Sequence, residues 1–273
     1  MKKKENVSQY GGPLKAVIFD WAGTVIDYGS CAPAVAFVEV FHKNGVEITM
    51  AEAREPMGMA KRDHIAAILQ MPAVRDRWKI ARGALPSEED VNHLYEQFLP
   101  AQLQCLRDYG ELIPGAVETV AECRRRSMKI GSSTGYTKML MEVVMSAAAR
   151  QGFVPDSMTC ADDIGAGRPA PWMCFENARR MDVFPPAAVV KVDDTPVGIE
   201  AGRNAGMWTV GVTASGNLVG LTRDQVQQLD PAELARRCDR ASERLFAAGA
   251  HYVIESVAEL PSVLDDIEAG ITA

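Results

Sequence analysis

The sequence predicts an α/β fold, in which a doubly wound, mainly parallel sheet forms the core and an all-helical cap domain is inserted after the first strand. Two observations support this prediction. Short apolar runs rich in β-branched residues recur along the chain and alternate with segments of helical periodicity. Between residues 29 and 109, helical segments follow one another without a convincing strand. We therefore place the core domain at residues 1–28 and 110–273 and the cap domain at residues 29–109.

The predicted strands are short and apolar, as is typical of strands buried on both faces of a parallel sheet. The first one ends in a carboxylate, where the apolar run VIF meets the stretch DWAGT. The predicted strands are residues 14–20, 128–133, 157–161, 188–193, 208–212 and 251–255.

Helical periodicity fills most of the remaining chain. In the core we expect helices at residues 115–126, 137–151, 171–181 and 195–206, and helices with charged faces between residues 216 and 247. In the cap we expect them at residues 32–44, 50–54, 61–69, 73–82 and 87–107. The Gly- and Pro-containing stretch YGELIPG, residues 109–115, is the expected return to the core.

The composition excludes several classes of partner. A formal net charge of −7 opposes general attraction to nucleic acid or to an anionic membrane, because both depend on clustered Lys and Arg. No apolar run approaches the roughly 18 residues of a membrane span. The lysines at positions 2–4 precede polar residues, so we expect a ragged N-terminus without a signal peptide. The six cysteines have no metal-ligand spacing, which predicts neither zinc nor disulfides. We expect a cytoplasmic protein.

Four of the predicted strands lead into polar residues, and an open α/β sheet binds its ligands beyond the carboxyl ends of its strands. The first strand leads to Asp20, the second to Thr134 in SSTG, the third to Arg168 in GRP, and the fourth to Asp193 and Asp194 in VDDT. Phosphoryl transfer needs an attacking oxygen, a cation for the equatorial oxygens, and Mg²⁺. Carboxylate and carbonyl oxygens are suitable ligands for Mg²⁺.

In this order, VIFDWAGT, SSTG, GRP and VDDT resemble the four motifs of the haloacid dehalogenase superfamily, and the helical insert is similar to its cap. Members that hydrolyse phosphate esters usually carry a second Asp two residues after the nucleophile, as general acid and base. Here that position is Ala22. Some members place another Asp four residues beyond the metal carboxylate, where this chain has Gly198. Either activity has been lost, or the leaving group is carbon and needs no such proton.

A carbon leaving group needs an electron sink, which a Schiff base between a lysine and an adjacent carbonyl supplies. The cap offers Lys61, and His64 lies three residues further on the same helix face. With PMGMAK, SSTGYT, AGRPAPW and KVDDT, nearly the whole chain closely resembles the phosphonatase family of this superfamily. The resemblance implies hydrolysis of the carbon–phosphorus bond of phosphonoacetaldehyde, in the degradation of 2-aminoethylphosphonate.

The same resemblance implies a role for each site residue. Asp20 is the nucleophile, and Lys61 forms the imine with His64 as a proton carrier. Mg²⁺ is the expected cofactor, held by Asp20, the Ala22 carbonyl and Asp194, while Asp193 binds it directly or through water. The substrate-binding residues are Thr134, Arg168, Tyr136, Met57 and Gly58.

Two other interpretations of the sequence stay open. One is an ordinary phosphatase or phosphomutase of the superfamily, which Ala22 argues against. The other is a non-catalytic binding protein on the same scaffold. The resemblance further implies a homodimer.

Overall fold

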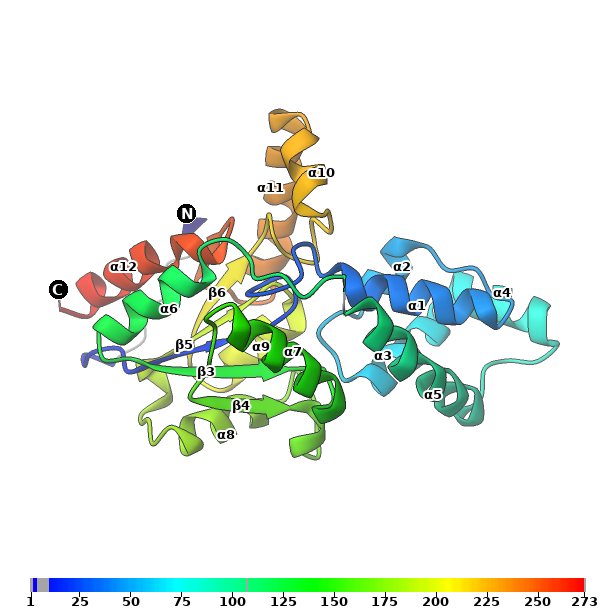
Figure 1. Cartoon of the computed structure of the whole chain (residues 1–273), viewed down its shortest axis with the longest axis horizontal. Coiled ribbons are helices and arrows are strands. Elements are labelled where there is room, and N and C mark those ends of the chain that lie inside the picture. Colours follow the sequence, from blue (N-terminus) through cyan, green and yellow to red (C-terminus); the bar gives the residue numbers. More distant parts are fainter. Residues whose placement is uncertain (1, 4–9, 107, 273) are drawn as a thin grey trace.

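A seven-stranded sheet lies at the centre of the protein, in a computed structural model that describes residues 2–3, 10–106 and 108–272. The strand order is β1-β7-β6-β5-β2-β3-β4. The pairs from β7 to β4 are all parallel, and β1 is antiparallel to β7. Helices cover both faces of the sheet, and a separate group of helices, α1 to α5, lies to one side of it (Figure 1). The predicted doubly wound, mainly parallel core is therefore confirmed.

The parallel strands lie where the sequence predicts them, within two residues at each end. They are β2 (Ala16–Phe19), β3 (Lys129–Thr134), β4 (Ser157–Cys160), β5 (Val189–Asp193), β6 (Trp208–Val212) and β7 (Tyr252–Ile254). Side chains of β2 alternate between two apolar cores, with Val17 and Phe19 on one face and Ala16 and Ile18 on the other. This two-sided burial is the reason that the strand is continuously apolar.

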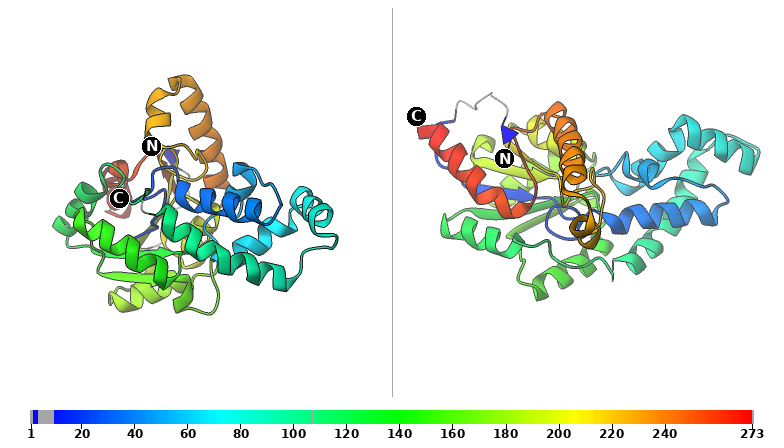
Figure 2. Two further views of the ribbon diagram at one scale, coloured as in Figure 1. Left: turned by 45° about the vertical axis from the view of Figure 1, so that its right-hand side comes forward. Right: turned by 90° about the horizontal axis from the view of Figure 1, so that it is seen from above.

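Helices complete both layers of the core. They are α6 (Ala116–Arg125), α7 (Lys138–Arg150), α8 (Trp172–Arg180), α9 (Pro196–Asn204), α10 (Arg223–Gln228), α11 (Pro231–Ala247) and α12 (Leu260–Thr272). Buried side chains of α6, α7 and α12 join one core, while those of α8 and α9 join the core on the opposite face. In Figure 1 and in the left view of Figure 2, α10 and α11 project from the rest of the core.

Two elements were not expected from the sequence. Lys2 and Lys3 form the edge strand β1, so the predicted ragged N-terminus is wrong at these two residues, and Lys4 lies outside the described residues. Helix α12 buries Leu260, Val263 and Leu264 against the sheet core. Their spacing of three and four residues is a helical signal that the sequence analysis did not use.

The helices on one side of the sheet have an apolar core of their own. They are α1 (Cys31–Lys43), α2 (Met50–Arg54), α3 (Lys61–Gln70), α4 (Pro72–Arg82) and α5 (Glu88–Cys105). Phe37 stacks on Phe98 at 4.2 Å between ring centroids, and Phe41 meets Trp78 edge to face. We keep the predicted limits of the cap, residues 29–109, as a proposal that this separate core supports.

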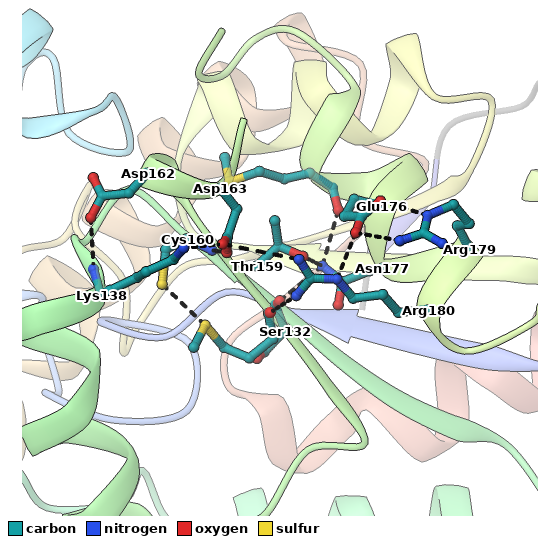
Figure 3. A network of polar contacts seen from close by, with 12 residues as sticks. Ser132, Lys138, Thr159, Cys160, Asp162, Asp163, Glu176, Asn177, Arg179 and Arg180 are labelled. Carbon is teal, nitrogen blue, oxygen red and sulfur yellow. Dashed lines mark hydrogen bonds and ion pairs between the residues drawn. The ribbon is translucent and has the colours of Figure 1, made fainter. Parts of the chain in front are cut away.

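A buried amide links α8 to two strands that lead to the site (Figure 3). Nδ2 of Asn177 donates hydrogen bonds to the Ser132 carbonyl at 2.9 Å and to Thr159 Oγ1 at 3.0 Å. It also donates to the Met173 carbonyl at 3.0 Å within its own helix. Asn177 therefore fixes α8 against β3 and β4, the strands that precede Thr134 and the Arg168 loop.

Replacing Asn177 by leucine, which has a similar shape, should destabilise the core. The change removes the amide donor and leaves buried acceptors without a partner, so we expect the free energy of unfolding to fall by about 2–4 kcal/mol in urea denaturation. Arg179→Gln on the same helix is the control, because the Arg179 side chain is 73% exposed and its loss should cost under about 0.5 kcal/mol. Equal stability of the two variants would contradict the anchoring role of Asn177.

Candidate active site

The carboxyl ends of the parallel strands and the α1–α5 group enclose one cavity. Nine of the predicted site residues line it, namely Asp20, Ala22, Met57, Gly58, Lys61, Thr134, Tyr136, Arg168 and Asp194. The two that do not line it are Asp193, which lies below its floor, and His64. The cavity offers only about 20 Å³ to the centre of a water-sized molecule, room for little more than one water. A substrate larger than water therefore needs the side chains or elements that line the cavity to rearrange.

Asp20 follows β2 and is held at the edge of the sheet by its backbone N–H, which donates to the Val192 carbonyl at 2.9 Å. Its Oδ1 lies 2.7 Å from Nη2 of Arg168. The same nitrogen donates to the Ser133 carbonyl at 2.7 Å, so Arg168 links Asp20 to the end of β3. Burial and the nearby Asp193 raise the pKa of Asp20, and Arg168 counteracts them.

Both oxygens of Asp193 lie close to neighbouring groups. Its Oδ1 accepts hydrogen bonds from the Thr195 N–H at 3.0 Å and the Thr195 hydroxyl at 2.7 Å. Its Oδ2 lies 2.7 Å from Lys191 Nζ and 3.3 Å from Arg168 Nη1. Burial alone would raise the pKa of Asp193, but the two cations outweigh it and hold the pKa below its usual value. An Asp engaged in this way orients its neighbours.

Asp194 has weaker compensation. Its Oδ2 accepts a hydrogen bond from the Asn217 N–H at 2.7 Å, and its Oδ1 accepts a long one from the Thr24 hydroxyl at 3.5 Å. Burial and the charges of Asp20 and Asp193 raise its pKa well above the usual value. Each of these three carboxyl groups offers an oxygen, and the three oxygens lie within 4.8 Å of one another. A buried cluster with excess negative charge and hard oxygen donors fits a divalent metal ion.

Position 198 is glycine in this chain, where some members of the superfamily have another Asp four residues after the residue that corresponds to Asp194. The structure shows why a side chain does not fit there. A Cβ atom at position 198 would lie 2.0 Å from Cγ of Asp193. Any side chain there would displace the carboxylate that Lys191 and Arg168 hold. The Asp193 carboxylate already occupies the space in question.

Lys61 is the first residue of α3, and its side chain reaches the cavity between aromatic rings. Its Nζ lies 4.8 Å from the centroid of Tyr136, 5.6 Å from that of Phe37 and 6.0 Å from that of Phe98. Burial lowers its pKa to about 7, and Arg168 adds to the effect while Asp20 opposes it. A substantial share of the side chain is thus the neutral amine near neutral pH, as attack on a carbonyl requires.

His64 lies behind Lys61 in the helical group. Its ring is 3.9 Å from that of Phe37, and its Nε2 lies 2.9 Å from the Ala53 carbonyl, so Nε2 carries the hydrogen. Within the part of the chain that the structure describes, Nδ1 has no hydrogen-bond partner. Burial and the nearby Lys61 lower the pKa of His64 well below its usual value. The imidazole is neutral.

Two glycines let the helical group sit directly on the sheet edge. Gly58 has a φ of 95°, and a Cβ there would lie 2.4 Å from Thr195 Oγ1. A Cβ at Gly135, after β3, would lie 2.5 Å from the Met59 carbonyl oxygen. On one side of the cavity, the backbone of the helical group therefore contacts the backbone at the sheet edge. The Met57 side chain is buried beside this contact.

Sequence reasoning missed Lys191, the fully buried partner of Asp193. The signal was present, because Lys191 is the single charged residue in the apolar run AAVVKV just before the two aspartates. A lysine that faces into a parallel sheet needs a paired anion, and the adjacent Asp193 supplies it.

Comparison with known proteins places this geometry in a family. The profile of the haloacid dehalogenase-like hydrolases matches residues 14–206. The chain belongs to the haloacid dehalogenase-like hydrolases. The family resemblance inferred from the four motifs is thereby confirmed, and so is the expectation of a hydrolase.

Within this hydrolase family, curated relatives align over nearly the full chain. A protein of Bacillus cereus (strain G9842) named phosphonoacetaldehyde hydrolase is 46% identical over 255 residues, which are 93% of this chain and 97% of the relative. A protein of the same name from Hahella chejuensis is 49% identical and covers 95% of this chain, with 88% of its own length matched.

Solved structures agree with this placement. The crystal structure of a phosphonoacetaldehyde hydrolase-like protein from Oleispira antarctica matches 100% of this chain and 98% of its own, at a TM-score of 0.94 and 43% identity. A putative β-phosphoglucomutase from Bacteroides vulgatus, 19% identical, has a TM-score of 0.67 over 96% of this chain and 91% of its own, and shares the fold alone. Of the helices in the described ranges, none is long and apolar enough to cross a membrane.

The depressed pKa of Lys61 should appear in the pH dependence of stability. The native pKa of about 7 lies below that of an unfolded lysine, about 10.4, so the unfolded chain binds more protons between these values and stability rises with pH there. Relative to Lys61→Met, the wild type should gain up to about 1.4 kcal/mol per pH unit in this window, measured by denaturation from pH 6 to 10.

Lys79→Met, at an exposed position of α4, is the matched control and should retain the wild-type dependence on pH. The Lys61→Met variant should also be the more stable protein below pH 7, because it has no buried cation to accommodate. Parallel stability curves for the wild type and Lys61→Met would show that Lys61 titrates normally.

Proposed function

We propose that this protein hydrolyses the carbon–phosphorus bond of phosphonoacetaldehyde to acetaldehyde and inorganic phosphate, in the degradation of 2-aminoethylphosphonate. The observation that carries the proposal is the shared cavity of Lys61 and Asp20. A buried amine with a pKa of about 7 and a buried carboxylate reach the same small space. The names of the relatives and their identity along the chain support the same substrate.

Lys61 provides the electron sink. Its neutral Nζ adds to the aldehyde carbon, and loss of water leaves a protonated imine two bonds from phosphorus. When the carbon–phosphorus bond breaks, its electron pair moves into the imine and gives an enamine. Protonation of the enamine carbon and hydrolysis of the imine release acetaldehyde and restore the amine. The leaving group therefore needs no acid at position 22, which is alanine.

Asp20 provides the nucleophile. One oxygen attacks phosphorus and forms an aspartyl phosphate, which water then hydrolyses to inorganic phosphate. Arg168 can bind phosphonate oxygens with its guanidinium, since it already reaches Asp20 Oδ1 in the closed cavity. Thr134 Oγ1 accepts a hydrogen bond from the Tyr136 N–H at 3.1 Å, which leaves its own hydrogen for a phosphonate oxygen.

The helical group and the loop after β3 supply the remaining roles. Met57, Gly58 and Tyr136 enclose the carbon end of the substrate and exclude water. His64 is neutral, and its unpartnered Nδ1 is the acceptor that a proton leaving the Lys61 adduct would need. We assign it the transfer of protons during imine formation.

The cofactor proposed for the carboxylate cluster is Mg²⁺. Asp20, the Ala22 carbonyl and Asp194 would hold it, and Asp193 would act through water or by orienting the cluster, because its own oxygens are occupied. Bound Mg²⁺ would neutralise the charge that repels an anionic phosphonate from the buried aspartates.

Trapping with borohydride tests the proposed chemistry directly. With phosphonoacetaldehyde and Mg²⁺, reduction should inactivate the protein and leave a two-carbon adduct on Lys61 in peptide mass mapping. Phosphate release should fall by more than about 10³-fold in Asp20→Asn and Lys61→Arg, because each removes a group that bonds covalently to substrate. Chelation by EDTA should abolish release, and Mg²⁺ should restore it.

The control separates the two covalent steps. Asp20→Asn keeps the lysine, so it should still give the Lys61 adduct while releasing no phosphate. An adduct on another lysine would refute the assignment of Lys61. Equal turnover of a simple phosphate ester would favour a phosphatase or phosphomutase, and no turnover of either substrate would favour a binding protein.

The proposal includes a cytoplasmic homodimer. Cys31, Cys105, Cys123, Cys160 and Cys174 form no disulfide, as is usual in a reducing compartment. Helix α8 exposes Trp172 beside a groove that Phe175, Glu176 and Arg179 also line. We propose this face as the contact with a second copy across a two-fold axis.

Light scattering during gel filtration should give twice the mass of one chain at micromolar concentration. Trp172→Glu should give the mass of one chain, because a carboxylate would have to be buried at the centre of the contact. Arg236→Glu, on the projecting α11, should leave the mass of the dimer unchanged. A wild type with the mass of a single chain would exclude the homodimer.

A further inference from the structure

The loop that follows β6, residues 213–221, contacts both the turn after Asp20 and the start of the helical group. The Ser215 hydroxyl donates to the Gly23 carbonyl at 2.9 Å, in the turn that follows Asp20. The Ser215 carbonyl accepts from the Gly29 N–H at 2.7 Å, where the chain enters the helical group. The loop therefore touches both the nucleophile turn and the connection to the cap.

Asn217, in the same loop, is bonded on two sides. Its backbone N–H donates to Oδ2 of Asp194 at 2.7 Å, which leaves Oδ1 as the oxygen available to a cation. Its side chain exchanges two hydrogen bonds with Arg54, the last residue of α2 in the cap. Arg54 Nη1 donates to Asn217 Oδ1 at 3.0 Å, and Asn217 Nδ2 donates to the Arg54 carbonyl at 3.1 Å.

The surroundings favour this pairing. Asn217 is buried, and Gly220 leaves room for the guanidinium, since a Cβ there would lie 2.9 Å from Arg54 Nε. Arg54 Nη1 also donates to the carbonyls of Gly29 at 2.6 Å and Ser30 at 3.2 Å. Arg54 precedes the stretch that carries Met57, Gly58 and Lys61, so its position determines where that stretch meets the core.

We propose that Asn217 is a positioning residue that couples closure of the cap to metal binding at Asp194. Docking of Arg54 fixes the Asn217 side chain, and with it the backbone N–H that orients the Asp194 carboxylate. Coupling of this kind is reciprocal, so a bound cation must also favour the closed cap. The inference rests on the proposed Mg²⁺ site but not on the identity of the substrate.

A double-mutant cycle on Mg²⁺ affinity tests the coupling without substrate. Asn217→Ala keeps the backbone N–H to Asp194 and removes only the contact with Arg54. Arg54→Met keeps most of the side-chain stem and touches no proposed ligand. We expect each to weaken Mg²⁺ binding in calorimetry by about tenfold, as is typical for groups behind metal ligands. The double variant should lose less affinity than the sum of the two single losses, because both variants remove the hydrogen bond from Arg54 Nη1 to Asn217 Oδ1.

Arg244→Ala is the matched control. Arg244 Nη2 also reaches the cap, at Glu55 Oε1 3.0 Å away, but both side chains of this pair are exposed. Its Mg²⁺ affinity should equal that of the wild type. Wild-type affinity in Asn217→Ala, or additive losses in the double variant, would overturn the proposal. Circular dichroism and melting show that each variant is folded, and Arg54→Gln replaces Arg54→Met if the latter unfolds.

Hydrogen exchange supplies the second measurement. Mg²⁺ should slow exchange of the amides of residues 50–61 in the wild type and in Arg244→Ala, and should have no effect there in Asn217→Ala. Slowing in Asn217→Ala equal to that in the wild type would refute the coupling. Because both measurements omit substrate, they stay decisive if phosphonoacetaldehyde is not hydrolysed, whereas failed trapping on Lys61 alone would refute only the proposed reaction.

Discussion

The site depends on an imbalance of buried charge. Three carboxylates, Asp20, Asp193 and Asp194, lie together at the edge of the sheet, and two permanent cations, Arg168 and Lys191, face them. Asp193 contacts both cations and shares Arg168 with Asp20, while burial and the two neighbouring carboxylates raise the pKa of Asp194 well above its usual value. The adjacent residues Asp193 and Asp194 therefore differ in their pKa because the cations lie against Asp193.

The second chemical property of the site is the neutral amine of Lys61, which depends on the packing of the helical group against the sheet. Lys61 has a pKa of about 7 because aromatic rings of the cap and Tyr136 of the core surround it. Opening would return Nζ to water and with it the ordinary preference for the charged form. In the proposed mechanism Asp20 belongs to the sheet and Lys61 to the helical group, so the two groups share one cavity only where the helical group packs on the sheet.

The sequence was sufficient for the strands and for most of the cavity lining, because parallel strands present motif residues at one edge. It was insufficient where three-dimensional contacts decide. The pairing of Lys2 and Lys3 with β7 depends on a free sheet edge, which no local pattern reveals. The Arg54–Asn217 contact joins residues 163 positions apart. Gly198 could be read as a missing acid, but only the position of Asp193 explains it.

The direct contact between Gly135 and the Met59 carbonyl has an evolutionary consequence. On this side the backbone sets the size of the cavity, so substitutions among the surrounding side chains leave that size unchanged. A lineage under selection for a bulkier ligand would have to lengthen or reroute one of the two loops. Descendants of this protein would therefore come to accept bulkier ligands through insertions and deletions in these loops rather than through point substitutions.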